Sequence, residues 1–139
     1  MSTVTGTPSY DRVQVGQELP ELTVPLTRTL IVATAIASRD YQDVHHDPEL
    51  ARERGSKDIF MNILSTNGFV GRFVTDWAGP DAVLKRVAIR LGVPNYPGDS
   101  MRLTGVVRAK VDGAVEVEVR GANSLGDHVS GTVTVALPR

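Results

Sequence analysis

The hydrophobic period of the sequence changes once, near Gly79 and Pro80, and this change limits the folds open to the chain. Before it, apolar residues recur at spacings of three and four, which predicts an amphipathic helix. These residues are Ile59, Ile63, Leu64, Phe69, Val70, Phe73, Val74 and Trp77. After it, apolar and polar residues alternate, which predicts half-buried strands. A helix followed by sequential strands favours an α+β architecture, with helix on one face of an antiparallel sheet.

Four strands are predicted in the last third of the chain, at 86–91, 101–111, 115–120 and 129–137. Asp112-Gly113 and Gly126-Asp127 are turn sequences between them, so we expect hairpins at both places. His128 directly follows the second turn sequence, and we expect it to lie in that hairpin with a structural role.

The first part of the chain is less regular. Glycines and prolines interrupt residues 1–14, so we expect a flexible lead there and the domain proper at 15–139. Leu22, Val24 and Leu26 alternate with polar residues as in a short strand. The run from Leu30 to Ser38 is apolar on nearly all sides, which predicts a buried helix, capped by Thr27 or Thr29 and ending beside Asp40.

Composition removes several classes of function. A chain of 139 residues fits one domain, and a formal net charge of −1 provides no general attraction to nucleic acid or to an anionic membrane. The absence of cysteine excludes disulfides, thiolate metal sites and a thiol nucleophile. The first residues do not resemble a secretory signal, and no apolar run approaches the roughly 20 residues of a membrane span. We therefore expect a soluble, cytoplasmic protein.

The main chemical signal is a stretch that combines carboxylates with two adjacent histidines, from Arg39 to Pro48. Asp40 lies at the predicted end of a helix, and His45 lies five residues later in a loop. Histidine titrates near neutral pH, and a nearby carboxylate orients its ring or holds the other side of a water molecule. The pair is thus a candidate for proton transfer at an activated carbon, and a solvated acidic loop with incidental histidines is the alternative.

Other chemistries fit the stretch less well. A divalent metal is disfavoured, because adjacent histidines do not readily face one ion and no His-Glu-x-x-His or calcium-loop pattern is present. The sequence also has neither the Gly-x-Ser-x-Gly elbow of serine hydrolases nor a phosphate-binding glycine loop. We expect no metal and no bound cofactor.

At this stretch the sequence resembles the MaoC-like, or hydratase 2, family of hotdog-fold enzymes. The family signature Gly-Asp-x-Asn-Pro-Ile-His, followed by Asp-x-x-x-Ala, is matched in register by Asp40, Val44, His45, Asp47 and Ala51. A second family segment, Pro-x-x-Pro-Gly-Asp-x-Leu, resembles residues 93–101. The resemblance implies a sheet wrapped around a central helix, and it assigns the family's catalytic aspartate and histidine to Asp40 and His45.

The chain departs from the family pattern at several positions. Arg39, Gln42 and Asp43 replace the glycine, asparagine and proline of the signature, so we expect a differently shaped loop. The family's His-Gly at the start of the central helix is Met61-Asn62 here. A backbone N–H at that point holds the thioester oxygen in the family, and the resemblance therefore implies this role for the N–H of Asn62.

Within the family, the sequence is most similar to the small subunits of heteromeric enoyl-CoA hydratases of actinobacterial cholesterol side-chain degradation. This branch implies a steroid acyl-CoA substrate such as 3-oxo-pregnadiene-carboxyl-CoA, and a larger partner subunit with its own MaoC-like domain. A chain this small offers too little surface to enclose such a ligand, so we expect a heterodimer, a heterotetramer or a homodimer. A hotdog acyl-CoA thioesterase and a non-catalytic acyl-CoA-binding or scaffolding subunit are the alternative functions.

Overall fold

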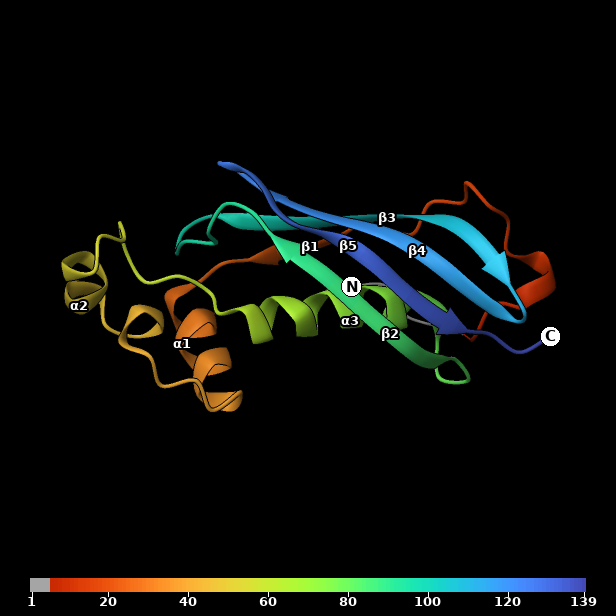
Figure 1. Cartoon of the computed structure of the whole chain (residues 1–139), viewed down its shortest axis with the longest axis horizontal. Coiled ribbons are helices and arrows are strands. Elements are labelled where there is room, and N and C mark those ends of the chain that lie inside the picture. The colour runs from red at the N-terminus through yellow and green to blue at the C-terminus, as the bar shows by residue number, and fades with distance from the viewer. Residues whose placement is uncertain (1–5) are drawn as a thin grey trace.

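The computed structural model describes residues 6–139, which form one antiparallel sheet with a long helix against one face (Figure 1). The strands are β1 (Leu22–Pro25), β2 (Val83–Leu91), β3 (Ser100–Val111), β4 (Ala114–Asn123) and β5 (Gly126–Ala136). Their order in the sheet is β1-β3-β4-β5-β2, and every neighbouring pair is antiparallel. The helices are α1 (Arg28–Ala37), α2 (Pro48–Glu53) and α3 (Ile63–Ala78), with 3-10 turns η1 (Tyr10–Arg12) and η2 (Asp43–His45). The expected α+β architecture is confirmed.

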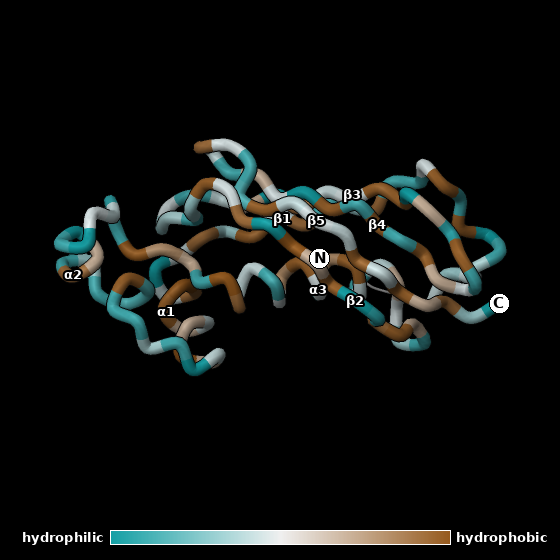
Figure 2. The backbone as a smooth tube through the Cα atoms, in the orientation of Figure 1, coloured by the Kyte–Doolittle hydropathy of each residue, from teal (hydrophilic) through white to brown (hydrophobic). Residues whose placement is uncertain are grey.

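The core lies between α3 and the inner face of the sheet. The alternation of the strands, visible in Figure 2, places Val117 of β4 opposite Val107 of β3 and Val133 of β5, and all three are buried. The ring of Phe73 on α3 packs against β3 at Gly105, where the absence of a side chain makes room for it. A Cβ on that glycine would come within 2.8 Å of the Phe73 ring. Burying an aromatic or branched side chain typically contributes about 1.5–3 kcal/mol, so this layer supplies much of the stability.

The central helix begins later than the periodicity predicts. Ile59 is buried but lies outside any helix or strand, and α3 starts at Ile63 because the side chain of Asn62 caps it by accepting a hydrogen bond from the Ser65 N–H. The hydrophobic period therefore begins before the helix, in the segment that precedes it. At the other end, Gly79 has a φ of 79° and terminates the helix as expected.

The prediction that the apolar run 30–38 is a buried helix is only partly right. Thr27 caps α1 as expected, accepting from the Leu30 N–H, but only Ile31 and Ala35 of the helix are buried. Ile36 is 52% exposed. The reason is position: α1 and α2 lie together beyond the end of the sheet, where α1 contacts α3 and η2 through one side (Figure 1). The outer side of α1 is therefore an apolar surface.

Residues 6–14 of the expected flexible lead are in contact with the domain. The Tyr10 N–H donates to the Pro138 carbonyl at 2.8 Å, and Val13 is buried. Residues 1–5 lie outside the described part of the chain, and the division of the chain at residue 15 stays a prediction. None of the helices in residues 6–139 is both long enough and apolar enough to span a membrane.

Candidate active site

The turn at the end of α1 positions Asp40. The Asp40 N–H donates to the Ala35 carbonyl and the Arg39 N–H donates to the Ile36 carbonyl, both at 2.9 Å. These two bonds form a Schellman cap, which requires a left-handed residue just after the helix. Arg39 is that residue, with a φ of 56°. The backbone thus adopts a conformation that glycine favours, although an arginine occupies it, and it presents Asp40 toward the following loop.

His45 is held by a backbone carbonyl on one side and faces Asp40 on the other. Its Nδ1 lies 2.7 Å from the carbonyl oxygen of Phe60, and its ring contacts the Phe60 ring edge-on at a centroid distance of 5.0 Å. Because a carbonyl only accepts, Nδ1 carries the hydrogen, and Nε2 of the neutral ring is left with a lone pair. Nε2 lies 3.4 Å from Oδ2 of Asp40, and His45 is only 7% exposed. The two predicted residues therefore do converge.

Hydrogen bonds stabilise the charged form of Asp40. The largest influence is the side chain of Asn62, whose Nδ2 donates to Oδ2 at 3.1 Å and lowers the pKa of the carboxyl. Burial acts in the opposite direction, while the Gln42 N–H at 3.2 Å from Oδ1 and the nearby His45 lower the pKa further. The net direction of the Asp40 pKa shift is downward, so these contacts favour the ionised carboxylate.

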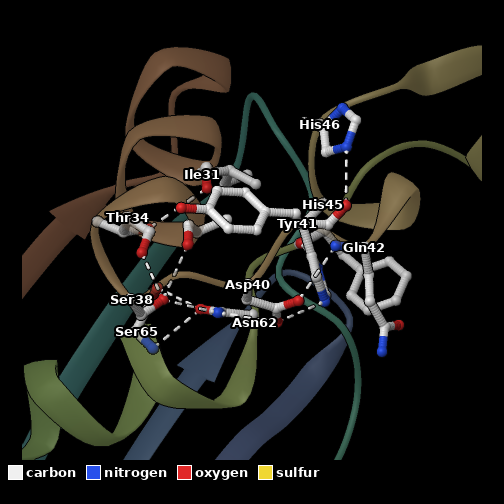
Figure 3. A network of polar contacts seen from close by, with 12 residues as sticks. Ile31, Thr34, Ser38, Asp40, Tyr41, Gln42, His45, His46, Asn62 and Ser65 are labelled. Atoms are coloured by element: carbon white, nitrogen blue, oxygen red, sulfur yellow. Dashed lines mark hydrogen bonds and ion pairs between the residues drawn. The ribbon is translucent and has the colours of Figure 1, made fainter.

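The carboxamide of Asn62 links this pair to the start of α3 (Figure 3). Its Oδ1 accepts hydrogen bonds from the N–H and the hydroxyl of Ser65. Its Nδ2 donates to Oγ of Ser38 at 3.0 Å as well as to Asp40. The Ser38 hydroxyl in turn donates to the Thr34 carbonyl at 2.7 Å. Two stretches that are remote in sequence, residues 34–40 and residues 62–65, thus share one polar network.

The segment 59–62 passes between the two stretches that resemble family motifs. The Phe60 N–H donates to the Val44 carbonyl, and the Met61 N–H donates to the Asn95 carbonyl, both at 3.1 Å. Asn62 itself is 2% exposed, and its backbone N–H has no acceptor among the hydrogen bonds found within residues 6–139. That N–H lies at the N-terminus of a 16-residue helix, where the helix dipole favours negative charge.

A groove runs alongside the network between α1 and α3. It has a volume of about 310 Å³, and Ser38 and Ser65 belong to its wall. Its other lining residues are Thr34, Ala37, Leu64, Gly68, Phe69 and Arg72. The groove is open to solvent and mostly apolar, and Asn62 links its Ser38 and Ser65 wall to Asp40. It therefore suits an apolar group close to this network.

Three other polar residues of the stretch have structural partners. Asp43 pairs with Arg54 at 2.7 Å, Asp47 caps α2 by accepting from the Leu50 N–H, and Nε2 of His46 contacts the Tyr41 carbonyl at 3.2 Å. In residues 6–139, no group of three or more His, Cys, Asp or Glu residues is arranged to hold a metal ion.

His128 lies on a strand of the β4–β5 hairpin and not in its turn. It lies within β5, is 2% exposed, and points between α3 and the segment before β3. Its Nδ1 lies 2.6 Å from the Val93 carbonyl, and its Nε2 lies 2.8 Å from the Thr66 hydroxyl. The strand begins three residues earlier than predicted, at Gly126, and the pairing register shifts at His128, which lies between the pairs Gly121–Val129 and Ala122–Asp127. This β-bulge allows the His128 side chain to be buried next to Val129. Its expected structural role agrees with these contacts.

A curved antiparallel sheet on a central helix, with an Asp–His pair at the helix start, is the arrangement of hotdog-fold hydratases. Comparison with known proteins agrees with this class. The model of the MaoC-like domain family matches residues 12–137. A solved structure of R-hydratase PhaJ1 from Pseudomonas aeruginosa superposes with a TM-score of 0.83 at 24% identity, over 94% of this chain and 86% of that one, and it supports the hotdog fold.

The chain belongs to the MaoC-like domain family. It is 53% identical over 123 residues to the 3-oxo-4,17-pregnadiene-20-carboxyl-CoA hydratase beta subunit of Mycobacterium tuberculosis, a match that covers 88% of this chain and 95% of that one. The crystal structure of the ChsH1-ChsH2 complex from Mycobacterium tuberculosis contains a similar chain. The TM-score is 0.88 at 52% identity, with 90% of this chain and 98% of that chain covered.

Proposed function

We propose that this protein is the catalytic small subunit of a cytoplasmic enoyl-CoA hydratase that adds water to the unsaturated side chain of a steroid acyl-CoA thioester. A substrate such as 3-oxo-pregnadiene-carboxyl-CoA is supported by the name of the Mycobacterium tuberculosis relative. The observation that carries the activity is the 3.4 Å approach of His45 Nε2 to Asp40 Oδ2 beside an apolar groove. Both facing atoms accept hydrogen bonds, so one water molecule beside them can donate one O–H to each.

In the proposed reaction, His45 is the base. The Phe60 carbonyl keeps the hydrogen on Nδ1, so Nε2 is free to take a proton from the water as its oxygen attacks the β-carbon. Asp40, kept ionised by Asn62, orients the water and stabilises the imidazolium that forms. The same proton, held between the two side chains, then passes to the α-carbon. One O–H bond of water and the π bond of the C=C double bond break, one C–O and one C–H bond form, and no cofactor takes part.

Negative charge develops on the thioester oxygen during the attack and needs a donor. The backbone N–H of Asn62 meets the requirement, because it is buried, has no acceptor within residues 6–139 and lies at the start of α3. Donors of this kind typically contribute a factor of about 10²–10³ to the rate.

A partner subunit is needed to complete the binding site. The groove is shallow relative to a steroid with a coenzyme A arm, and Ile36, Ile63 and Leu64 beside it are about half exposed. We propose that a larger subunit with a MaoC-like domain covers this surface. The structural similarity to a chain of the ChsH1-ChsH2 complex supports a heteromer.

The test is an assay of the chain co-expressed with its MaoC-like partner. Loss of the enoyl-thioester absorbance without release of free thiol is expected, and thiol release would instead indicate a thioesterase. Asp40→Asn should reduce turnover by roughly 10²–10⁴, the usual contribution of a positioned acid or base. Asp47→Asn is the matched control in the same loop, because asparagine and aspartate cap a helix equally well. Wild-type turnover in Asp40→Asn would mean that the chain has no catalytic carboxylate at this site.

A further inference from the structure

The geometry assigns a second role to Asn62, that of a positioning residue: its carboxamide group fixes the orientation of the Asp40 carboxylate. This role rests on the proposed hydration and is separate from the backbone N–H of the same residue. It concerns the side chain alone, at a position where the family pattern has a glycine.

The orientation of the amide is determined by its partners. Oδ1 faces the Ser65 backbone N–H, which only donates, so the oxygen must be on that side. Nδ2 therefore points to Ser38 and Asp40. The Ser38 hydroxyl donates its hydrogen to carbonyl oxygens of α1, so its oxygen accepts the hydrogen bond from Nδ2 of Asn62. Both hydrogens and both lone pairs of the amide are thus occupied, and the side chain is left with one orientation.

The fixed amide holds one oxygen of the Asp40 carboxylate, and the loop holds the other. Asp40 is tied to the loop through the Gln42 N–H at Oδ1, while Oδ2 receives Asn62 and faces Nε2 of His45. Among the titratable groups of residues 6–139, His45 is the one whose charge acts on Asp40. Without the amide, Oδ2 has no donor to hold it toward His45, and the carboxylate loses its largest source of stabilisation.

Asn62→Ser separates this role from the capping of α3. Serine is as good a cap as asparagine and leaves the backbone N–H in place, but it does not reach Asp40. In the complex with the partner subunit, turnover should fall by roughly tenfold to a hundredfold, the scale of one hydrogen bond to a charged group. The acidic limb of the pH–rate profile should move to higher pH, while KM changes by less. Asn67→Ser, an exposed asparagine on the same helix, is the matched control and should behave as wild type.

Titration of the Asp40 carboxyl by NMR in the full chain gives a readout that does not depend on activity. The pKa of Asp40 should be higher in Asn62→Ser than in the wild type and unchanged in Asn67→Ser. If the pKa and the acidic limb both stay in place, the inference is wrong, whatever the change in turnover. If the pKa rises but the wild-type complex does not hydrate enoyl thioesters, the positioning role stands and the proposed function fails.

Discussion

Two buried histidines lie on either side of the start of α3 and are anchored in the same way. His45 places Nδ1 against the Phe60 carbonyl at 2.7 Å, and His128 places Nδ1 against the Val93 carbonyl at 2.6 Å. Each ring therefore has an unprotonated Nε2 when neutral. The two sites differ in what faces that atom, since His128 meets the hydroxyl of Thr66 whereas His45 meets the carboxylate of Asp40.

The partner of Nε2 gives His128 a structural role and leaves His45 available for chemistry. The Thr66 hydroxyl donates to Nε2 of His128, so both ring nitrogens are satisfied and the side chain fastens β5 to α3 and to the segment before β3. At His45 the facing carboxylate only accepts, which leaves Nε2 available to a molecule that brings its own hydrogen. A tautomer fixed by a backbone carbonyl is thus common to both, and the partner of the second nitrogen decides the role.

The same substitution at both histidines gives the largest expected contrast. His45→Gln should lower turnover by roughly 10²–10⁴ because it removes the base, and should change the free energy of unfolding by less than about 1 kcal/mol. His128→Gln should keep turnover within about tenfold of the wild type but cost about 2–3 kcal/mol of stability, since it disturbs two buried hydrogen bonds. Turnover of the complex and urea unfolding of the full chain measure the two effects. Equal losses of turnover in both variants would remove the distinction.

A smaller effect is expected in the pH dependence of stability. Burial lowers the pKa of His128 from its usual value of 6.5, with the Val93 bond opposing the shift. The unfolded chain therefore binds a proton at higher pH than the folded chain does. Stability from a neutral His128 is fully present above pH 6.5 and declines as the pH falls through the lowered pKa of the folded state.

Thermal unfolding at several pH values between 7.5 and 5 tests this expectation. The midpoint of the wild type should fall toward the acid end of this range, and His128→Gln should show a weaker fall. The carboxyl groups with lowered pKa, Asp40, Asp58 and Asp99, do not interfere, because their contributions are lost only below about pH 3.8. An identical slope in both proteins would show that His128 is not buried in the neutral form.

Local sequence patterns predicted the elements and the Asp–His pair because the relevant distances along the chain are short. Asp40 and His45 are five residues apart, Thr27 caps α1, and Asp112-Gly113 forms the β3–β4 turn with both residues at positive φ. The family motif fixed the register of the pair. The catalytic roles of these residues, and that of the Asn62 N–H, stay predictions.

The polar network around the pair could not be predicted, because it joins residues that only the tertiary fold brings together. Asn62 reaches Ser38 and Asp40 across 24 and 22 residues, and the Phe60 carbonyl that sets the tautomer of His45 is 15 residues away. An asparagine before a helix is a familiar cap, which gave no reason to assign its amino group a partner. The exposure of α1 was missed for a related reason. An apolar sequence predicts that a helix is covered, but it does not tell whether its own chain or a partner subunit covers it.

The shared action of Asp40 and His45 on one water is tested most directly by the turnover of Asp40→Asn, His45→Gln and the double variant in the complex. Residues that act as a unit give strongly non-additive losses. The double variant should therefore be only slightly slower than the slower single variant. If the two losses multiply instead, the two side chains act independently, and a single bridging water is not the basis of the reaction.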